Sequence, residues 1–214
     1  MFNKSSKYIT VVKFLALAMI FILTASSCIF VKVKEKPVEE VFVDVIQKPE
    51  IEMNEDALRS TKGDMISLIP KNWFFVDLGE NTPRDIFAIA VNPQYTLSVV
   101  FSTYPSNEVI DEIFKAQNLI GLSNYSFDKK QKKAMGGLIK EKRISTIKSG
   151  NLNFVVYNYR TKTQPIYSQT AVFKSSNGAI YEISLVPMNI SGYSLPPEKD
   201  IETIFKSILA TVRY

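Results

Sequence analysis

The sequence predicts an α+β fold: an α/β/α sandwich with a central, mostly antiparallel sheet of about six to seven strands flanked by two main helices. Three observations predict this class. Short turns containing glycine join neighbouring strand-like segments. Two other segments carry apolar residues at helical spacing. Residues 85–91 are apolar on both alternating sets, as expected of a strand covered on both faces.

The first half of the predicted domain consists mainly of strands. Pro70 ends the first of them, because proline cannot donate a hydrogen bond to a strand ladder. Trp73 opens the second, and a lone tryptophan after a turn is predicted to be a core residue. Strands are expected, in order, at residues 63–69, 73–77, 85–91 and 95–103.

A change of period after residue 103 predicts the first helix, over residues 106–120. Ser106 or Asn107 suits the N-terminal cap, and Gly121 suits the C-terminal end. Residues 118–137 are then expected to form a polar loop with some helical tendency near its end.

Hairpins dominate the second half of the domain. Ser149-Gly150 and Asn177-Gly178 are turn signals that each join two antiparallel strands. Strands are expected at residues 138–148, 151–160, 169–174 and 179–186.

A second helix closes the chain. Pro196, Pro197 and Glu198 suit its first turn. Its apolar residues share one stripe, which predicts that the helix lies flat on the sheet; they are Ile201, Ile204, Phe205, Ile208, Leu209 and Val212.

The N-terminal segment predicts export from the cytosol. Lys4, Lys7 and Lys13 precede a short apolar run at residues 14–23, which is the pattern of a secretory signal. Residues 24–28 then resemble the lipobox of bacterial lipoproteins, with Ala25 where that motif usually has leucine. The resemblance implies cleavage before Cys28, which would carry acyl chains.

Two alternatives to the lipid anchor stay open. Residues 14–31 together have the length of an uncleaved membrane helix. Cleavage without lipidation would instead release a secreted protein. The expected organisation is a lipoprotein signal peptide at 1–27, an extended tether at 28–60 and a globular domain at 61–214. The tether could also act as a strand that adds to the sheet edge of a partner.

Composition limits the chemistry that the domain can perform. Of 26 basic residues three lie in the signal, which leaves 23 against 21 acidic residues in the mature chain and gives no indication of a nucleic-acid partner. The single cysteine excludes an internal disulfide framework. The absence of histidine removes the commonest general base and metal ligand, so no metal and no cofactor is expected.

The sequence contains no convincing catalytic motif. The chain contains no G-x-S-x-G, Walker or G-x-G-x-x-G sequence. Two S-x-x-K matches occur, Ser126 to Lys129 and Ser145 to Lys148. Penicillin-binding enzymes use that motif at a helix start in a much larger domain, whereas Ser145 lies in a predicted strand. A hydrolase that works without histidine is therefore the weakest of the functional hypotheses.

One group of basic residues is the candidate partner-binding patch. It follows the first helix and enters the next strand; its members are Lys129, Lys130, Lys132, Lys133, Lys140, Lys142 and Arg143. Such a patch could meet anionic lipid, an acidic protein or cell-wall polymer. The alternative is a solvated loop and edge strand, where lysines discourage aggregation between sheets.

Residues 61–214 resemble the PsbP-like family, which includes photosystem accessory proteins and bacterial lipoproteins of the DcrB-like kind. The resemblance is carried by residues 66–73 (ISLIPKNW), 179–185 (AIYEISL) and 204–208 (IFKSI), and by the hairpins between them. It implies a domain without catalytic activity that binds or supports the assembly of other proteins.

The resulting hypothesis is a lipid-anchored, non-catalytic protein of the bacterial cell envelope that faces away from the cytosol. Its expected partners are the membrane, through lipidated Cys28, and another envelope protein. The alternative hypothesis is a carrier of a small molecule or lipid, with a pocket between the sheet and the helix at 106–120.

Overall fold

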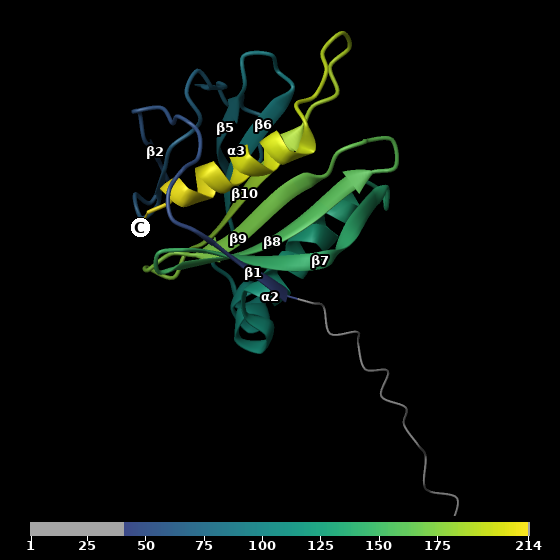
Figure 1. The fold of residues 1–214 in the computed structure, drawn as a ribbon. Coiled ribbons are helices and arrows are strands. Elements are labelled where there is room, and N and C mark those ends of the chain that lie inside the picture. Colours follow the sequence, from purple (N-terminus) through teal and green to yellow (C-terminus); the bar gives the residue numbers. More distant parts are fainter. Residues whose placement is uncertain (1–40, 214) are drawn as a thin grey trace, which may run out of the picture. The chain divides into compact units, whose positions relative to one another are not determined.

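An eight-stranded sheet lies at the centre of the computed structural model, which describes residues 41–213 apart from the side chains of residues 41, 42 and 142 (Figure 1). The strand order is β1-β7-β8-β9-β10-β6-β5-β4. All neighbours are antiparallel except β1 and β7, which are parallel. The predicted class is therefore confirmed as α+β, but the sheet is larger than the six to seven strands expected.

The strands differ greatly in length. The shortest lie at the β4 edge of the main sheet and in a separate two-stranded sheet formed by β2 and β3. Their bounds are β1 Val41–Ile46, β2 Leu58–Arg59, β3 Ile66–Ser67, β4 Phe74–Phe75, β5 Ile86–Val91, β6 Leu97–Thr103, β7 Leu138–Ser149, β8 Leu152–Thr161, β9 Ser168–Lys174 and β10 Ile180–Pro187.

The predicted start of the domain at residue 61 is wrong, because β1 is a strand of the main sheet. It pairs in parallel with β7 from Val41 opposite Ile144 to Ile46 opposite Ser149. All the described residues, 41–213, belong to one compact unit. Parallel neighbours are not joined by a hairpin turn, so no turn signal in the sequence indicates this pairing.

The segment after β1 also belongs to the fold. Met53 bridges Pro70, and the backbone N–H of Asn54 donates to the carbonyl of Ile69 at 2.8 Å. The predicted tether is thus wrong for residues 41–60. Its first part, at 28–40, the signal at 1–27 and Cys28 lie outside the described residues.

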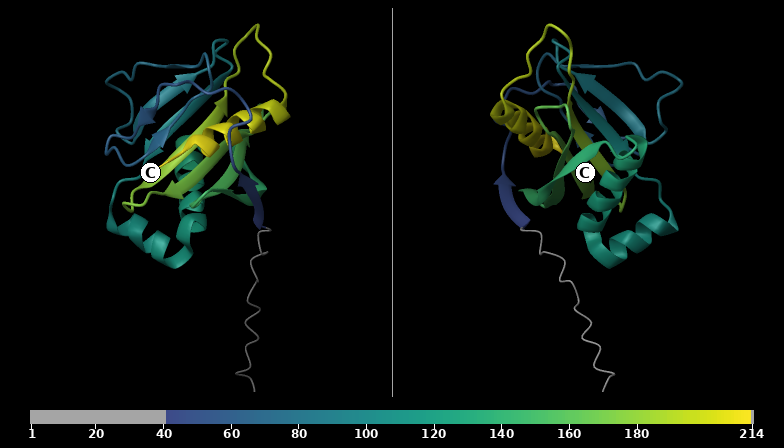
Figure 2. Two further views of the ribbon diagram at one scale, coloured as in Figure 1. Left: turned by 60° about the vertical axis from the view of Figure 1, so that its left-hand side comes forward. Right: turned by 90° about the vertical axis from the view of Figure 1, so that its right-hand side faces the viewer.

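Helix α2 (Glu108–Lys133) is almost twice as long as predicted. Asn107 caps it, as expected, by accepting a hydrogen bond from the backbone N–H of Ile110 at 3.0 Å. Asn118 interrupts the helix with φ 53° and ψ −147°, which produces a bend, and the chain then resumes helical geometry through residues predicted to be a polar loop (Figure 2). Gly121 is therefore not a C-terminal cap. It permits a close approach at the bend, where a Cβ atom would lie 2.6 Å from Cβ of Gln117.

Helix α3 (Glu198–Thr211) lies on the face of the sheet opposite α2, which gives three layers (Figure 2). Its predicted stripe is confirmed, since Ile201, Phe205 and Ile208 are buried. They pack with Phe154, Phe173 and other sheet residues in the main core.

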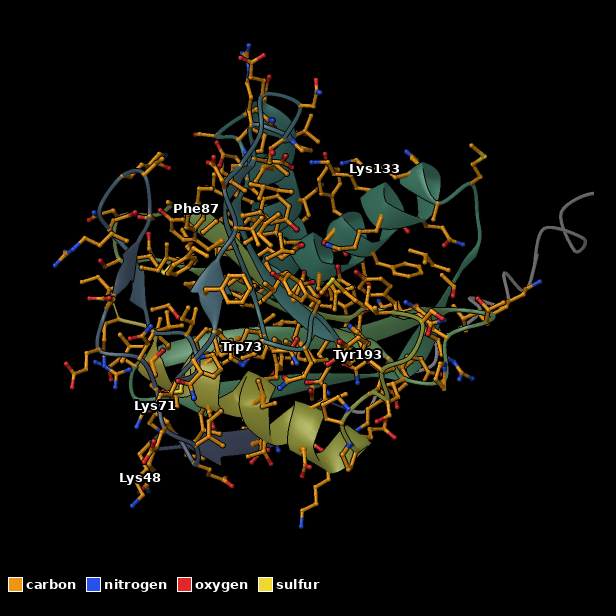
Figure 3. All side chains as sticks on the ribbon, turned by 90° about the horizontal axis from the view of Figure 1, so that it is seen from above. Lys48, Lys71, Trp73, Phe87, Lys133 and Tyr193 are labelled. Carbon is orange, nitrogen blue, oxygen red and sulfur yellow. The ribbon has the colours of Figure 1, made fainter. Side chains whose placement is uncertain are left out.

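Trp73 joins the same main core and is 7% exposed, as the sequence predicted (Figure 3). A smaller core lies under α2, where Ile110 and Leu122 meet Tyr157 and Val172. Within residues 41–213, no helix is both long and apolar enough to cross a membrane.

Candidate functional site

A pocket of about 170 Å³ lies between the C-terminal half of α2 and strands β5, β6 and β10. It arises because α2 packs against β7, β8 and β9, beside the strands that form the pocket floor. The floor there is made of small or short side chains, including Val100 and Ser102 from β6 and Ser184 and Val186 from β10. The antiparallel register places Ser102 opposite Glu182 and Val100 opposite Ser184.

Glu182 is the central ionisable group of this pocket and is only 7% exposed. Its Oε1 accepts hydrogen bonds from Lys130 Nζ and, at 3.2 Å, from Ser184 Oγ. Its Oε2 accepts hydrogen bonds from Ser126 Oγ and, at 2.8 Å, from Tyr104 Oη. Four donors on two oxygens satisfy a buried carboxylate, and Lys130 supplies the opposite charge.

The surroundings of Glu182 favour its ionised form. Burial by itself raises the pKa of this carboxyl, but the charge of Lys130 and the hydrogen bonds from Lys130, Ser126 and Tyr104 outweigh it, so the pKa lies below its usual value. Burial, and then the charge on Glu182, raises the pKa of Tyr104 well above its usual value. The same two causes raise the pKa of Tyr159 to about 12. At neutral pH Glu182 is therefore a carboxylate, and the phenols of Tyr104 and Tyr159 are neutral.

Neighbours within the domain occupy every hydrogen-bonding position of the Ser126 hydroxyl. Because it donates its single proton to Glu182, Tyr157 Oη must be the donor in the 2.5 Å contact between the two hydroxyls. Lys130 Nζ donates to the same Ser126 Oγ at 3.1 Å. A carboxylate with a lowered pKa is a weak base, so this arrangement does not activate the serine as a nucleophile.

The S-x-x-K pairing suggested by the sequence is not formed. Lys129 instead forms an ion pair with Asp85, with 2.8 Å between Nζ and Oδ2. The lysine that reaches Ser126 is Lys130, one residue later.

Sequence reasoning missed Glu182 altogether. A signal was available, because it is the only charged residue in the otherwise apolar or small-residue strand β10, and a covered strand carries a charge only where a partner is provided.

The candidate basic patch is divided between the two faces of the sheet. Lys129, Lys130 and Lys133 line the pocket under α2. Figure 3 labels Lys133, which lies near the end of that helix. Lys132 is exposed on the same helix. The remaining members belong to β7, whose alternating side chains point to opposite faces.

Lys140 lies on the α2 side of the sheet, where its Nζ donates to Asn124 at 2.6 Å and lies 5.7 Å from the centroid of the Phe127 ring. Arg143 instead lines a groove on the α3 side with Asp44 and Glu202. The side chain of Lys142 lies outside the described part of the chain. Three of the seven residues therefore meet at the pocket, and the group does not form one patch.

A second surface feature lies at the β4 edge of the sheet. Phe74, Phe75, Val76 and Tyr95 are 40%, 42%, 41% and 52% exposed. The rings of Phe74 and Tyr95 meet edge to face with centroids 5.5 Å apart. Tyr95 has φ 56°, a conformation that is unfavourable for a bulky residue and that recurs at functional sites.

Metal binding finds no support among residues 41–213, which contain no group of three or more acidic, cysteine or histidine side chains able to hold an ion.

Comparisons with known proteins give only distant neighbours. No protein-family model and no curated protein matches the chain. Among solved structures, cyanobacterial PsbP (CyanoP) from Synechocystis is 13% identical with a TM-score of 0.45, covering 74% of this chain and 91% of its own. A crystal structure from Bacteroides thetaiotaomicron is 14% identical with a TM-score of 0.40, covering 78% of this chain and 48% of its own.

A third neighbour is the immunity protein TplEi of T6SS from Pseudomonas aeruginosa, which is 10% identical with a TM-score of 0.36 and 78% coverage of both chains. The neighbours thus include a member of the PsbP-like group that the sequence resembles. All three TM-scores lie below 0.5, so none of them assigns a function to this chain.

Proposed function

We propose that this protein is a non-catalytic binding module of the bacterial cell envelope, held at a membrane through lipid on Cys28, that engages another envelope protein. The N-terminal pattern of lysines, a short apolar run and one cysteine supports the location. The exposed aromatic edge formed by Phe74, Phe75, Val76 and Tyr95 is the observation that carries the binding role.

Aromatic side chains suit a protein interface because they bury a large area and lose little conformational entropy. Phe74 and Phe75 lie on the outermost strand of the sheet, beside the turn that presents Tyr95. Leaving this apolar surface in water is unfavourable, and a partner that covers it would gain that free energy.

The absence of catalysis in this proposal rests on how the charged groups are used. Every hydrogen-bonding position that Glu182 and Ser126 offer is taken up by a neighbour within the domain. Such a network stabilises the structure and leaves neither Glu182 nor Ser126 poised to accept a proton from a substrate.

Partner capture tests the proposal. The full chain, solubilised in detergent from its own envelope, is expected to retain a specific protein. Phe74→Ser and Tyr95→Asn, which change the two rings that meet at this edge, should each weaken its retention by about tenfold or more. Val109→Ser is the matched control, because Val109 is 56% exposed on α2 and lies outside the aromatic edge. Retention that is unchanged by both edge variants, or lost equally in the control, contradicts the proposal.

A second candidate function is favoured by the pocket between α2 and the sheet. A small-molecule carrier needs a cavity with a few convergent polar groups, and this pocket provides one. It lies under the second half of α2 and not at residues 106–120, where the sequence placed it. Native mass spectrometry of the gently purified chain is expected to show a bound small molecule, and a fully empty population would count against a carrier.

A further inference from the structure

We propose that the pocket between α2 and the sheet binds the anionic group of a small ligand, a carboxylate or a phosphate, through Lys129 and Lys133. This inference rests on the second candidate function, since it names the class of ligand that the pocket would carry. It depends on the charges that line the pocket, on which of them are already neutralised, and on where they lie along the strands.

The charges of the pocket do not cancel. Lys130 is balanced by Glu182, and both are largely buried. Lys129 forms an ion pair with Asp85, whose side chain is 28% exposed. Lys133 also lines the pocket, and a neighbouring hollow contains Lys129 and Lys133 again together with Arg84. The two hollows together present four basic side chains against two acidic ones.

The basic side chains gather at one end of the pocket. Thr103, which ends β6, bonds through its backbone N–H to the carbonyl of Asp85 at 2.8 Å, so the ion pair of Asp85 and Lys129 lies at that end. Val186 lies at the other end of the floor, opposite Ser98 in the sheet register. The anionic group therefore belongs beside Lys129 and Lys133, with a short apolar portion directed over Val100 and Val186.

A second negative charge is unfavourable deep in the pocket, close to Glu182. Glu182 already carries a negative charge and its oxygens have all their donors. Lys129, in contrast, is partly exposed and Lys133 is exposed, and both keep N–H groups for a ligand. A volume of about 170 Å³ is smaller than the roughly 300–1,000 Å³ that holds a drug-sized molecule, so the ligand is small.

The test is a titration of the full chain in detergent with two probes, inorganic phosphate and butyrate. NMR spectra of the backbone amides are expected to show the largest shifts at Ser102, Thr103 and Ser184 with at least one probe. Binding of phosphate alone identifies a phosphate site, and binding of butyrate alone identifies a carboxylate site; either supports the proposal. If neither probe shifts these amides at concentrations of about 50 mM, far above ordinary ligand affinities, the proposal is wrong.

Three variants are expected to change anion binding in three different ways: one weakens it, one tightens it and one leaves it unchanged. Lys133→Gln should weaken binding about tenfold by removing one charge–charge contact. Asp85→Asn should tighten binding, because it frees Lys129 and removes a repelling carboxylate; a purely structural role for Asp85 would not produce tighter binding. Lys132→Gln is the matched control, since Lys132 is exposed on the same helix and does not line the pocket. Equal weakening by Lys132→Gln and Lys133→Gln overturns the inference.

Failure of the anion-binding proposal can be distinguished from failure of the proposed functions. The variants at the aromatic edge do not touch the pocket, so partner capture and anion binding can fail separately. Recovery of an uncharged ligand would keep the carrier function and exclude the anion site.

Discussion

Replacing Lys130 by methionine should destabilise the domain by leaving Glu182 as a buried, unpaired charge. Methionine keeps most of the length of the lysine side chain, so the change removes the charge with little loss of packing. Glu182 is 7% exposed and would lose the partner that balances its burial. Removing one member of a buried ion pair typically costs about 3–5 kcal/mol. The lower figure applies here, because the side chain of Lys130 is 24% exposed and water can enter where it stood.

A cost of about 3 kcal/mol corresponds to a fall in melting temperature of about 6–12 °C for a domain of this size. The assay is thermal unfolding followed by circular dichroism and by the fluorescence of Trp73, the single tryptophan, which is buried. Glu182→Gln should cost less, because it leaves behind the partly exposed Lys130, which can turn toward water. Lys132→Met is the matched control on the same helix and should change little.

The loss of stability caused by Lys130→Met should depend on pH. In the natural chain the pKa of Glu182 is lowered, so its contribution to stability is present above the unfolded value of about 4.5 and is lost as the pH falls through the folded value. In the Lys130→Met variant burial raises the pKa of Glu182 instead. Protonation then relieves the unpaired charge, and the deficit relative to the natural chain should shrink from pH 7 to pH 5. An unchanged melting temperature, or a deficit that grows with acid, would refute the reasoning.

Three further predictions concern other parts of the chain. Gly121→Ala should destabilise by about 1–3 kcal/mol, because its Cβ would lie 2.6 Å from Cβ of Gln117, whereas Gly79→Ala meets nothing within 4 Å and should be nearly neutral in the same unfolding assay. A chain beginning at residue 61 should lose cooperative thermal unfolding, because it lacks β1 and buried Ile46; a chain beginning at residue 39 should keep it. Cys28→Ser should move the protein from the membrane fraction to the soluble fraction, and an unacylated mass for the natural N-terminal peptide would contradict the anchor.

Local patterns in the sequence predicted the elements that depend on local interactions. The stripe of α3 and the turns at Gly150 and Gly178 required only neighbours along the chain, and both glycines have positive φ. The edge strand β1 was missed because its partner Ile144 lies about a hundred residues away and no turn joins them. The second half of α2 was missed because Asn118 and Gly121 together have the appearance of a helix end.

The candidate site could be predicted only in part, since its members come from distant strands. Lysines near the end of α2 were expected to form a surface for a partner, and Lys129, Lys130 and Lys133 do meet at the pocket. Glu182 was not expected, because its ion pair with Lys130 joins residues far apart in the sequence. Arg143 was wrongly grouped with them, because sequence proximity does not show which face of a strand a side chain occupies.

The second half of α2 contains a sequence signal for the pocket that an apolar stripe alone would not reveal. Leu122, Ser126, Lys130 and Lys133 follow one another at spacings of four, four and three residues, which places them on one face of a helix. Leu122 and Ser126 are fully buried, so this face is directed at the sheet. The stripe changes from apolar to polar and then to charged while it continues over strands of the same sheet. A charge at a largely buried position such as that of Lys130 is costly unless a partner meets it, and Glu182 does so. Lys133 follows at the exposed end of the same stripe, where the anionic ligand proposed above would meet it.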